Sequence, residues 1–369
     1  MESVYQFSLF GIIPYYFVLL CLLVLYVNGV NKFQQTKWCF WAIFILAAIR
    51  YGVAYDYFSY RGIILEDVDD QELVRLEPFS RIIVELARIT HYQLFFIIGS
   101  FLTIYPIYKV CIKYSIDPTL SLIVYYLYPS FYLEGLGIVR NAIAFSFVFY
   151  AFMLLLEKKK AKTALFLLCA AMFHKSAFIA FLIFPVLYLI QSKKLYLGMY
   201  IFSFMVSALI AAVIGAYADQ IMLLSAAQQY VENETAGGGM MTFIINGICI
   251  LNFILWARLE IADAFVKFYL CSYTVGACLW NVFLPIDAVM AGRFCSFFTI
   301  PLLLIVPIYP CVISKEYEVF IKRQIVVFFI LLFTSHFYIN ISAYLESPGK
   351  MSTVPYQTIF WYTDYNNLI

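Results

Sequence analysis

The sequence predicts an all-α polytopic membrane protein with about 12 transmembrane helices. Of its 369 residues, 64% are hydrophobic and only 12% are charged, whereas soluble domains contain about 45–50% apolar and about 25% charged residues. Apolar stretches close to the length of about 20 residues that crosses a bilayer recur along the whole chain, separated by short charged breaks. We therefore expect one membrane domain over residues 1–343.

The expected helices follow the apolar runs in order. The first run, 10–27, lacks the positive n-region and small-residue cleavage site of a signal peptide, so we interpret it as a retained span. The run from Trp38 to Ile49 is too short to cross about 30 Å of hydrocarbon, so the second helix should continue past Arg50. The twelve expected helices are 10–27, 37–55, 92–112, 118–136, 138–156, 161–173, 176–191, 195–217, 240–257, 264–284, 291–313 and 322–343.

Two connections between these helices need a specific argument. Gly135 and Gly137 indicate a sharp turn between the fourth and fifth helices. The apolar stretch 161–190 is too short for two full spans. One long helix, however, would move every later loop to the opposite side of the membrane and place Lys193 and Lys194 outside, against the charge bias. We therefore expect a short hairpin there, with His174 and Lys175 at its tip.

The charged loops orient the helices. Cytoplasmic loops are enriched in Lys and Arg, and one assignment of alternate loops places fifteen of the 24 basic residues on one side, which we interpret as the cytoplasm. Both termini then face outward. Thirteen of the fifteen Lys lie inside and seven of the nine Arg outside. Because guanidinium binds phosphate or carboxylate oxygens in bidentate fashion, an Arg-rich outer face indicates an anionic ligand; surface ion pairs of Arg61, Arg75 and Arg88 are the alternative explanation.

Composition excludes several classes of function. The net charge is +2, and the basic residues form no tail or stripe that could bind a phosphate backbone, so nucleic-acid binding is not expected. The nine Cys fall in apolar segments without a C-x-x-C pair, so we expect free, buried thiols. No G-x-x-x-x-G-K-[ST], G-x-G-x-x-G or H-E-x-x-H motif is present, so we expect no nucleotide, no cofactor and no metal.

Four charged positions lie at or below the expected outer membrane boundary, where an ionisable group is costly and marks a candidate site. Arg50 should lie inside the bundle. Arg140 should open a helix, where free N–H groups also favour anions, and Arg293 should begin another outer-end helix. His174 and Lys175 should lie in a cavity below the outer surface; a His that caps a turn is the structural alternative.

The longest outer loop, 50–91, should contain an amphipathic helix that starts after Glu77 with Pro at its first position. It would lie flat at the interface or cover a site as a lid. One helical face is apolar and another charged: the apolar residues are Phe79, Ile82, Ile83 and Leu86, and the charged ones Arg81, Glu85 and Arg88.

Further outer segments are expected at 218–239, a loop, and at 344–369, a C-terminal tail. The long loop also holds a D-x-D at Asp67–Asp69, a pattern that binds a divalent cation in some sugar transferases. It stands in a run of six acids, which is more typical of a solvated loop than of a metal site.

Several of these residues stand in motifs whose order matters. They are Arg50 followed by Asp56-Tyr57 and Tyr60, Glu77-Pro78-Phe79, Arg140-Asn141-Ala142-Ile143-Ala144, Phe173-His174-Lys175-Ser176-Ala177, Gly292-Arg293 and Val354-Pro355-Tyr356. Over nearly the whole chain this ordered set resembles the EpsG family, which contains Wzy-type polysaccharide polymerases. The R-x-x-x-A and H-K-S-A elements are the most specific. The chain departs from the family at two places. Members often show G-T-D-Y where this chain has Val53-Ala54-Tyr55-Asp56-Tyr57, and R-Q where it has Arg140-Asn141.

The resemblance implies a GT-C-like membrane glycosyltransferase of the bacterial plasma (inner) membrane, with its active site facing the periplasm or the outside. Such an enzyme joins oligosaccharide repeat units carried on undecaprenyl diphosphate, which serves as donor and acceptor, and needs no metal or nucleotide. A chain-length regulator and a flippase in the same membrane are the other implied partners.

In such a reaction an acceptor hydroxyl attacks the anomeric carbon of the donor glycan as the lipid diphosphate departs. Arg140 and Arg293, with Arg50 or Lys175 in support, are expected to bind the diphosphate, because cations fixed in a low-dielectric site stabilise its charge best. One-step displacement would invert the anomeric configuration.

A base must take the hydroxyl proton. His174, with an unperturbed pKa near 6.5, Asp56 and Glu77 are the candidates, and the sequence does not choose between them. Contacts to the glycans are expected from Arg81, Tyr57 and Tyr356.

Three other functions are compatible with the same architecture. A lipid-linked glycan ligase would differ only in its acceptor. A translocator of the lipid-linked unit should have inward-facing charges along a path, whereas the candidate residues gather at outer helix ends. A membrane O-acyltransferase would also use an intramembrane His but should need cytosolic access for its acyl donor.

Overall fold

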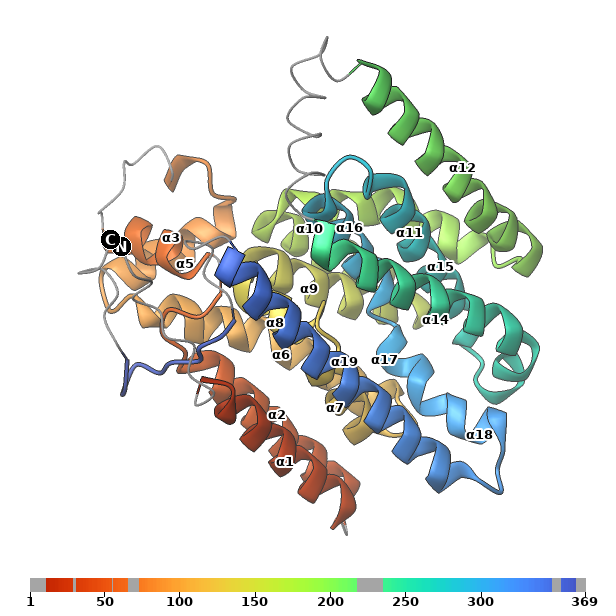
Figure 1. Ribbon diagram of the computed structural model, residues 1–369, viewed down its shortest axis with the longest axis horizontal. Coiled ribbons are helices and arrows are strands. Elements are labelled where there is room, and N and C mark those ends of the chain that lie inside the picture. The colour runs from red at the N-terminus through yellow and green to blue at the C-terminus, as the bar shows by residue number, and fades with distance from the viewer. Residues whose placement is uncertain are drawn as a thin grey trace. The chain divides into compact units, whose positions relative to one another are not determined.

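The computed structural model of the chain describes residues 11–28, 31–54, 56–65, 73–217, 235–346 and 353–362 (Figure 1). Within these ranges the regular structure is helical, and the only β pairing is two isolated bridges. The expected all-α class is therefore confirmed for the part of the chain that is described.

Five helices of the described chain are long and apolar enough to cross a membrane. They are α6 (Gln93–Tyr114), α9 (Val139–Leu156), α12 (Lys193–Tyr217), α14 (Thr235–Ala262) and α19 (Glu318–Glu346). A sixth span results if α16 (Ala288–Thr299) and the helical segment that follows it, bent by 43°, count as one. The chain is thus a polytopic helical membrane protein, but a total of twelve spans is not supported. The outward termini and the GT-C-like fold stay predictions.

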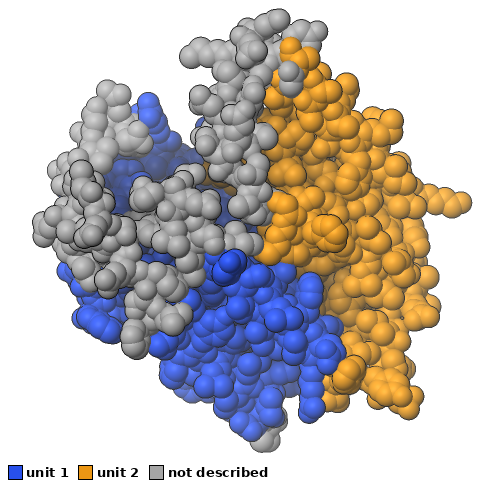
Figure 2. Space-filling view, viewed as in Figure 1, with its two compact units in different colours: residues 1–147, 168–175, 323–369 blue, residues 148–167, 176–322 orange. Residues whose placement is uncertain are grey.

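The chain divides into two compact units (Figure 2). Unit 1 comprises residues 1–147, 168–175 and 323–369, and unit 2 residues 148–167 and 176–322. Unit 1 contains α1 (Ile13–Val27), α2 (Lys32–Ala48), α3 (Tyr57–Leu65), α5 (Pro78–Arg88), α6, α7 (Pro118–Leu127), α8 (Tyr132–Gly137) and most of α19. Unit 2 contains α11 (Phe178–Leu189), α12, α14, α15 (Val266–Phe283), α16, α17 (Leu302–Ile305), η3 (Val306–Ile308) and α18 (Tyr309–Ile313). The helices α9 and α10 (Lys160–Phe173) contribute to both.

Unit 1 is organised around α2, which packs against α1, α6 and α7 (Figure 1). Asn31 caps α2 by accepting a hydrogen bond from the N–H of Phe33 at 3.0 Å. Asp117 caps α7 in the same way, directly before Pro118. These caps fix where two apolar helices start, and the buried faces of both helices contribute to the core of unit 1.

Unit 2 is organised around α15, which packs against α12, α14 and α16. Buried polar side chains join three of these helices. Asn246 of α14 accepts a hydrogen bond from the Tyr200 hydroxyl at 2.8 Å and donates one to Asn281 at 3.0 Å, and Asn281 donates to Ser203 at 3.1 Å. Because each amide has partners, the cost of burying these groups is offset.

The second helix is shorter than predicted. α2 ends at Ala48, and the backbone then pairs with the C-terminal segment, where the N–H of Tyr51 donates to the carbonyl of Gln357 at 2.9 Å. Gly52 follows with a φ of +62°, a conformation that favours glycine and ends the helical course. The helix therefore does not continue past Arg50, although that side chain does lie inside the protein, as expected, with 1% exposure.

Proline breaks two other expected helices. The helix expected at 118–136 is divided into α7 and α8, because Tyr128, which precedes Pro129, adopts extended backbone with φ −81° and ψ 112°. The helix expected at 291–313 begins earlier and is interrupted by Pro301, which follows the end of α16. Neither prediction of a continuous helix was right.

The break expected at His174 and Lys175 is confirmed, and the packing of the two arms against each other stays a prediction. α10 ends at Phe173, a short 3-10 helix, η2 (Lys175–Ala177), forms the turn, and α11 follows. The amphipathic helix is also confirmed, as α5.

The buried face of α5 differs from the expected one. Ser80, Ile83, Val84 and Ala87 are buried, whereas Ile82 and Leu86 are 61% and 41% exposed. Residues 66–72, with the D-x-D, and residues 218–234 of the second expected loop lie outside the described residues. The helix after that loop starts earlier than expected, at Thr235.

Candidate functional site

Arg140 is the centre of a polar cluster in unit 1. It is the second residue of α9, and its side chain is 25% exposed. Its Nη1 donates to Oε2 of Glu77 at 2.5 Å, and its Nε donates to the hydroxyl of Tyr60 at 2.8 Å. The guanidinium is thus held by two side chains from other helices, at a helix N-terminus whose free N–H groups also favour anions.

Glu77 joins three segments that are distant in sequence. It is the residue before Pro78 at the start of α5, and its side chain is only 12% exposed. While Oε2 accepts from Arg140, Oε1 accepts from the backbone N–H of Lys175 at 3.2 Å. Partial burial alone would raise the pKa of the Glu77 carboxyl, but Arg140 and backbone N–H groups, including that of Lys175, outweigh it and hold the pKa below its usual value.

The tip of the hairpin is fixed against α5. The buried hydroxyl of Ser80 donates to the carbonyl of Phe173 at 3.0 Å, and the rings of Phe79 and Phe173 meet edge to face at 5.4 Å. The half-buried His174 follows, close enough that its positive charge lowers the pKa of Glu77. The side chain of Lys175 is exposed rather than enclosed in the expected cavity.

Asp56 lies at the edge of this cluster. It is half-buried directly before α3, and its carbonyl accepts the N–H of Tyr60 at 3.0 Å. Burial raises the pKa of the Tyr60 phenol to about 12, an effect that the charge of Asp56 adds to and that of Arg140 opposes. Four of the expected site residues, namely Arg140, Glu77, His174 and Asp56, therefore lie in one unit around one salt bridge.

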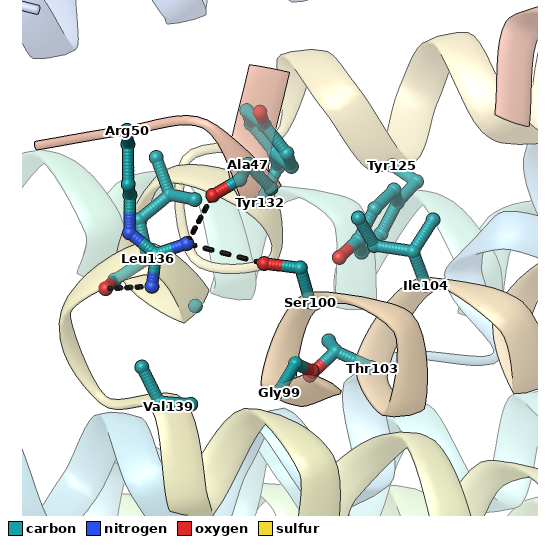
Figure 3. A pocket seen from close by; sticks show the side chains of 11 residues that line it. Ala47, Arg50, Gly99, Ser100, Thr103, Ile104, Tyr125, Tyr132, Leu136 and Val139 are labelled. Atoms are coloured by element: carbon teal, nitrogen blue, oxygen red, sulfur yellow. Dashed lines mark hydrogen bonds between the residues drawn. The ribbon is translucent and has the colours of Figure 1, made fainter. Parts of the chain in front are cut away.

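Three other expected site residues lie in the interior of unit 1. Tyr57 is 1% exposed, its hydroxyl donates to Gln93, and its ring stacks on Phe96 at 4.1 Å. Tyr356 is 6% exposed and donates to the carbonyl of Leu46 at 2.6 Å. Arg50 is bonded to backbone carbonyls and Ser100 (Figure 3). Their expected contacts with substrate stay predictions. Both phenols and both terminal nitrogens of Arg50 are hydrogen-bonded inside the protein, whereas the buried Nε of Arg50 has no partner within the described chain.

The two remaining expected residues are Arg81 and Arg293. Arg81 is exposed on α5, one turn from Glu77. Arg293 belongs to unit 2, where it lies in the middle of α16 rather than at its start, because the helix begins at Ala288 after the cap Asp287. Its side chain is half-buried, and its buried Nε has no hydrogen-bond partner within the described chain.

Two residues of the cluster had no role in the sequence analysis: Tyr60, which was named only as part of a motif, and Ser80, which was missed. Tyr60 contacts Arg140 directly, and its spacing of four residues from Asp56 would have placed both on one side of a helix. Ser80 was overlooked because it stands among the apolar residues of α5, although it follows Glu77 by three residues.

The cluster offers an anion site with a base beside it. A fixed guanidinium and a backbone N–H converge on one carboxylate, and an imidazole lies next to it. Among the described residues no group of three or more His, Cys, Asp or Glu side chains could hold a metal ion.

A family model describing the EpsG family matches residues 37–358. This range contains every residue of the cluster. Among curated proteins and solved structures, none matches the chain significantly.

Proposed function

Since the chain belongs to the EpsG family, which indicates a membrane polysaccharide polymerase, we propose that it polymerises oligosaccharide repeat units carried on undecaprenyl diphosphate. The reaction takes place at the outer leaflet of the bacterial plasma membrane, and both the donor and the acceptor are lipid-linked. The apolar helices agree with such a membrane enzyme.

One observation carries the proposal: the Glu77 carboxylate lies between the Arg140 guanidinium and the N–H of Lys175. Two donors that converge on one anionic group form the kind of site that phosphate oxygens use. These donors come from the start of α9 and from the hairpin tip, so the fold, rather than a local motif, builds the site. A diphosphate oxygen that enters would take the place of the carboxylate.

The chemistry follows from this exchange. The acceptor hydroxyl oxygen attacks the anomeric carbon of the donor, and the bond from that carbon to the diphosphate oxygen breaks. The electron pair leaves with the diphosphate, whose growing charge Arg140 stabilises. The configuration of the anomeric carbon is inverted, because the displacement occurs in one step.

The proton of the acceptor hydroxyl passes to a base in the same cluster. Glu77 is poorly basic while it is paired, since Arg140 lowers its pKa. When the diphosphate displaces it, that stabilisation is lost and the carboxylate becomes a stronger base. His174 and Asp56 are the alternative acceptors, and substitution of each identifies the one that sets the pH dependence of the rate.

Other expected residues have secondary parts in the proposal. The exposed Arg81 would bind sugar hydroxyls or acidic sugars beside α5. Lys175 contributes its backbone N–H to this site, and its exposed side chain adds positive charge beside the cluster.

The direct test uses the purified protein in vesicles with a single lipid-diphosphate repeat unit as the sole substrate. A ladder of longer lipid-linked glycans supports the proposal. If the unit only crosses the bilayer, the protein is a translocator. If product forms only when a different acceptor lipid is added, it is a ligase.

A further inference from the structure

Arg50 is buried without a carboxylate partner among the described residues. Its side chain is 1% exposed, and none of the ion pairs of the described chain includes it. A buried guanidinium is costly unless its donors are satisfied. The buried Nε of Arg50 has no partner within the described chain, whereas its two terminal nitrogens have hydrogen-bond partners.

Those partners are the ends of two helices. Nη1 donates to the carbonyl of Ala47 in the last turn of α2 at 2.5 Å and to Oγ of Ser100 on α6 at 3.1 Å. Nη2 donates to the carbonyl of Leu136 in the last turn of α8 at 3.2 Å. The guanidinium carbon also lies 5.0 Å from the centre of the Phe96 ring. Carbonyls at helix C-termini carry partial negative charge, so a cation placed between two of them is stabilised.

The carbonyl of Leu136 belongs to the turn that leads to Arg140. α8 ends at Gly137, Ile138 leaves helical geometry with a ψ of 60°, and α9 begins at Val139. Leu136, which Arg50 contacts, therefore precedes Arg140 by only four residues. A shift of this turn would move the start of α9 and, with it, the guanidinium that faces Glu77.

Packing and hydrogen bonds together hold the turn. Leu136 and Val139 are 4% and 2% exposed, and both line a small cavity of about 10 Å³ beside Arg50 (Figure 3). α6 approaches the start of α9 closely, since a Cβ on Gly99 would meet Val139 at 2.7 Å. The next residue of α6 is Ser100, a partner of Arg50, so α6 supports the turn both by packing and through the hydrogen bonds of Arg50.

We propose that Arg50 is a positioning residue for Arg140 and does not bind the substrate itself. By joining α2, α6 and the end of α8, it sets where α9 begins. The inference rests on the proposed role of Arg140 in binding a diphosphate. It replaces the expectation that Arg50 supports that binding by direct contact.

The test is a double-mutant cycle on binding of inorganic pyrophosphate to the purified full-length protein, with Arg50→Lys, Arg140→Lys and the double variant. A lysine cannot reach both carbonyls with a planar fork. We expect Arg50→Lys to weaken binding by roughly tenfold, and the double variant to bind no more weakly than Arg140→Lys alone, because both changes act through one group. Losses that multiply in the double variant would mean direct contact and overturn the inference.

Two further variants keep the test decisive. Ser100→Ala removes one hydrogen-bond partner of Arg50 and keeps its charge, so it should weaken pyrophosphate binding about two- to fivefold. Combined with Arg140→Lys, it should cause no further loss of binding. This variant tests the inference even where Arg50→Lys fails to fold. The control Ser146→Ala alters a buried serine of α9 that bonds only backbone carbonyls, and binding should not change.

If Arg50→Lys and Ser100→Ala lower only the melting temperature and leave binding intact, Arg50 is merely structural. If the unaltered protein binds no pyrophosphate, the anion site of the proposed function fails as well.

Discussion

Replacing Glu77 by Gln should make the protein bind diphosphate more tightly while it loses activity. In the unliganded protein the carboxylate accepts from Arg140 at 2.5 Å and from Lys175 at 3.2 Å, so an incoming diphosphate must displace it. A hydrogen bond with a charged partner contributes about 1.5–3 kcal/mol and a neutral one about 0.5–1.5 kcal/mol. Neutralising Glu77 should therefore remove about 1–1.5 kcal/mol of competition, which corresponds to about five- to tenfold tighter binding.

The assay is calorimetric titration of the purified protein with undecaprenyl diphosphate in detergent, together with the rate of glycan extension. The rate should fall by a factor of about 10²–10⁴ if Glu77 is the base. Glu85→Gln is a matched control, since it removes the same charge from the exposed face of α5 and should change neither quantity. Weaker binding by Glu77→Gln would refute the reasoning, because the carboxylate would then organise Arg140 for the ligand instead of competing with it.

Three further predictions concern the same cluster. The pKa of Glu77 is lowered in the folded protein, so its ion pair with Arg140 stabilises the fold at pH values above the unfolded pKa of about 4.3. This stabilisation is lost as the pH falls through the folded pKa. The melting temperatures of the native protein and Glu77→Gln should therefore differ near neutral pH and converge in acid. Tyr60→Phe removes the acceptor of the Arg140 Nε and should lower kcat about tenfold with little change in KM, as steady-state kinetics would show. Ser80→Ala leaves the buried carbonyl of Phe173 without its donor and should cost about 1–3 kcal/mol of stability, measured by denaturant unfolding; unchanged stability would mean that the hairpin tip is held by its aromatic contacts.

Local patterns in the sequence predicted local structure well. The helix α5 was identified from its apolar period and from Pro78, and the break around His174 from the length of its apolar stretch. Both depend on residues close together in the chain, which is where such patterns carry information. Arg140 was also placed correctly at a helix start by the glycines before it.

Contacts between distant segments could not be predicted in this way. Glu77 and Arg140 are 63 residues apart, and Tyr356 is 310 residues from the Leu46 carbonyl that it contacts. The premature end of α2 has the same origin, since its backbone pairs with the C-terminal segment instead of extending the helix. The sequence indicated that Arg50 is buried, but its partners are backbone carbonyls, which no residue type reveals.

The account depends most on Arg140 as the group that stabilises the departing diphosphate. The decisive measurement is the release of undecaprenyl diphosphate per glycosidic bond formed, by the purified protein and by Arg140→Lys, with the exposed Arg258→Lys as the control. We expect one diphosphate released for each bond in the native protein and the control, and a rate about 10²–10³ times lower in Arg140→Lys, as for loss of one transition-state donor. An Arg140→Lys protein that extends glycans at the native rate would contradict the account.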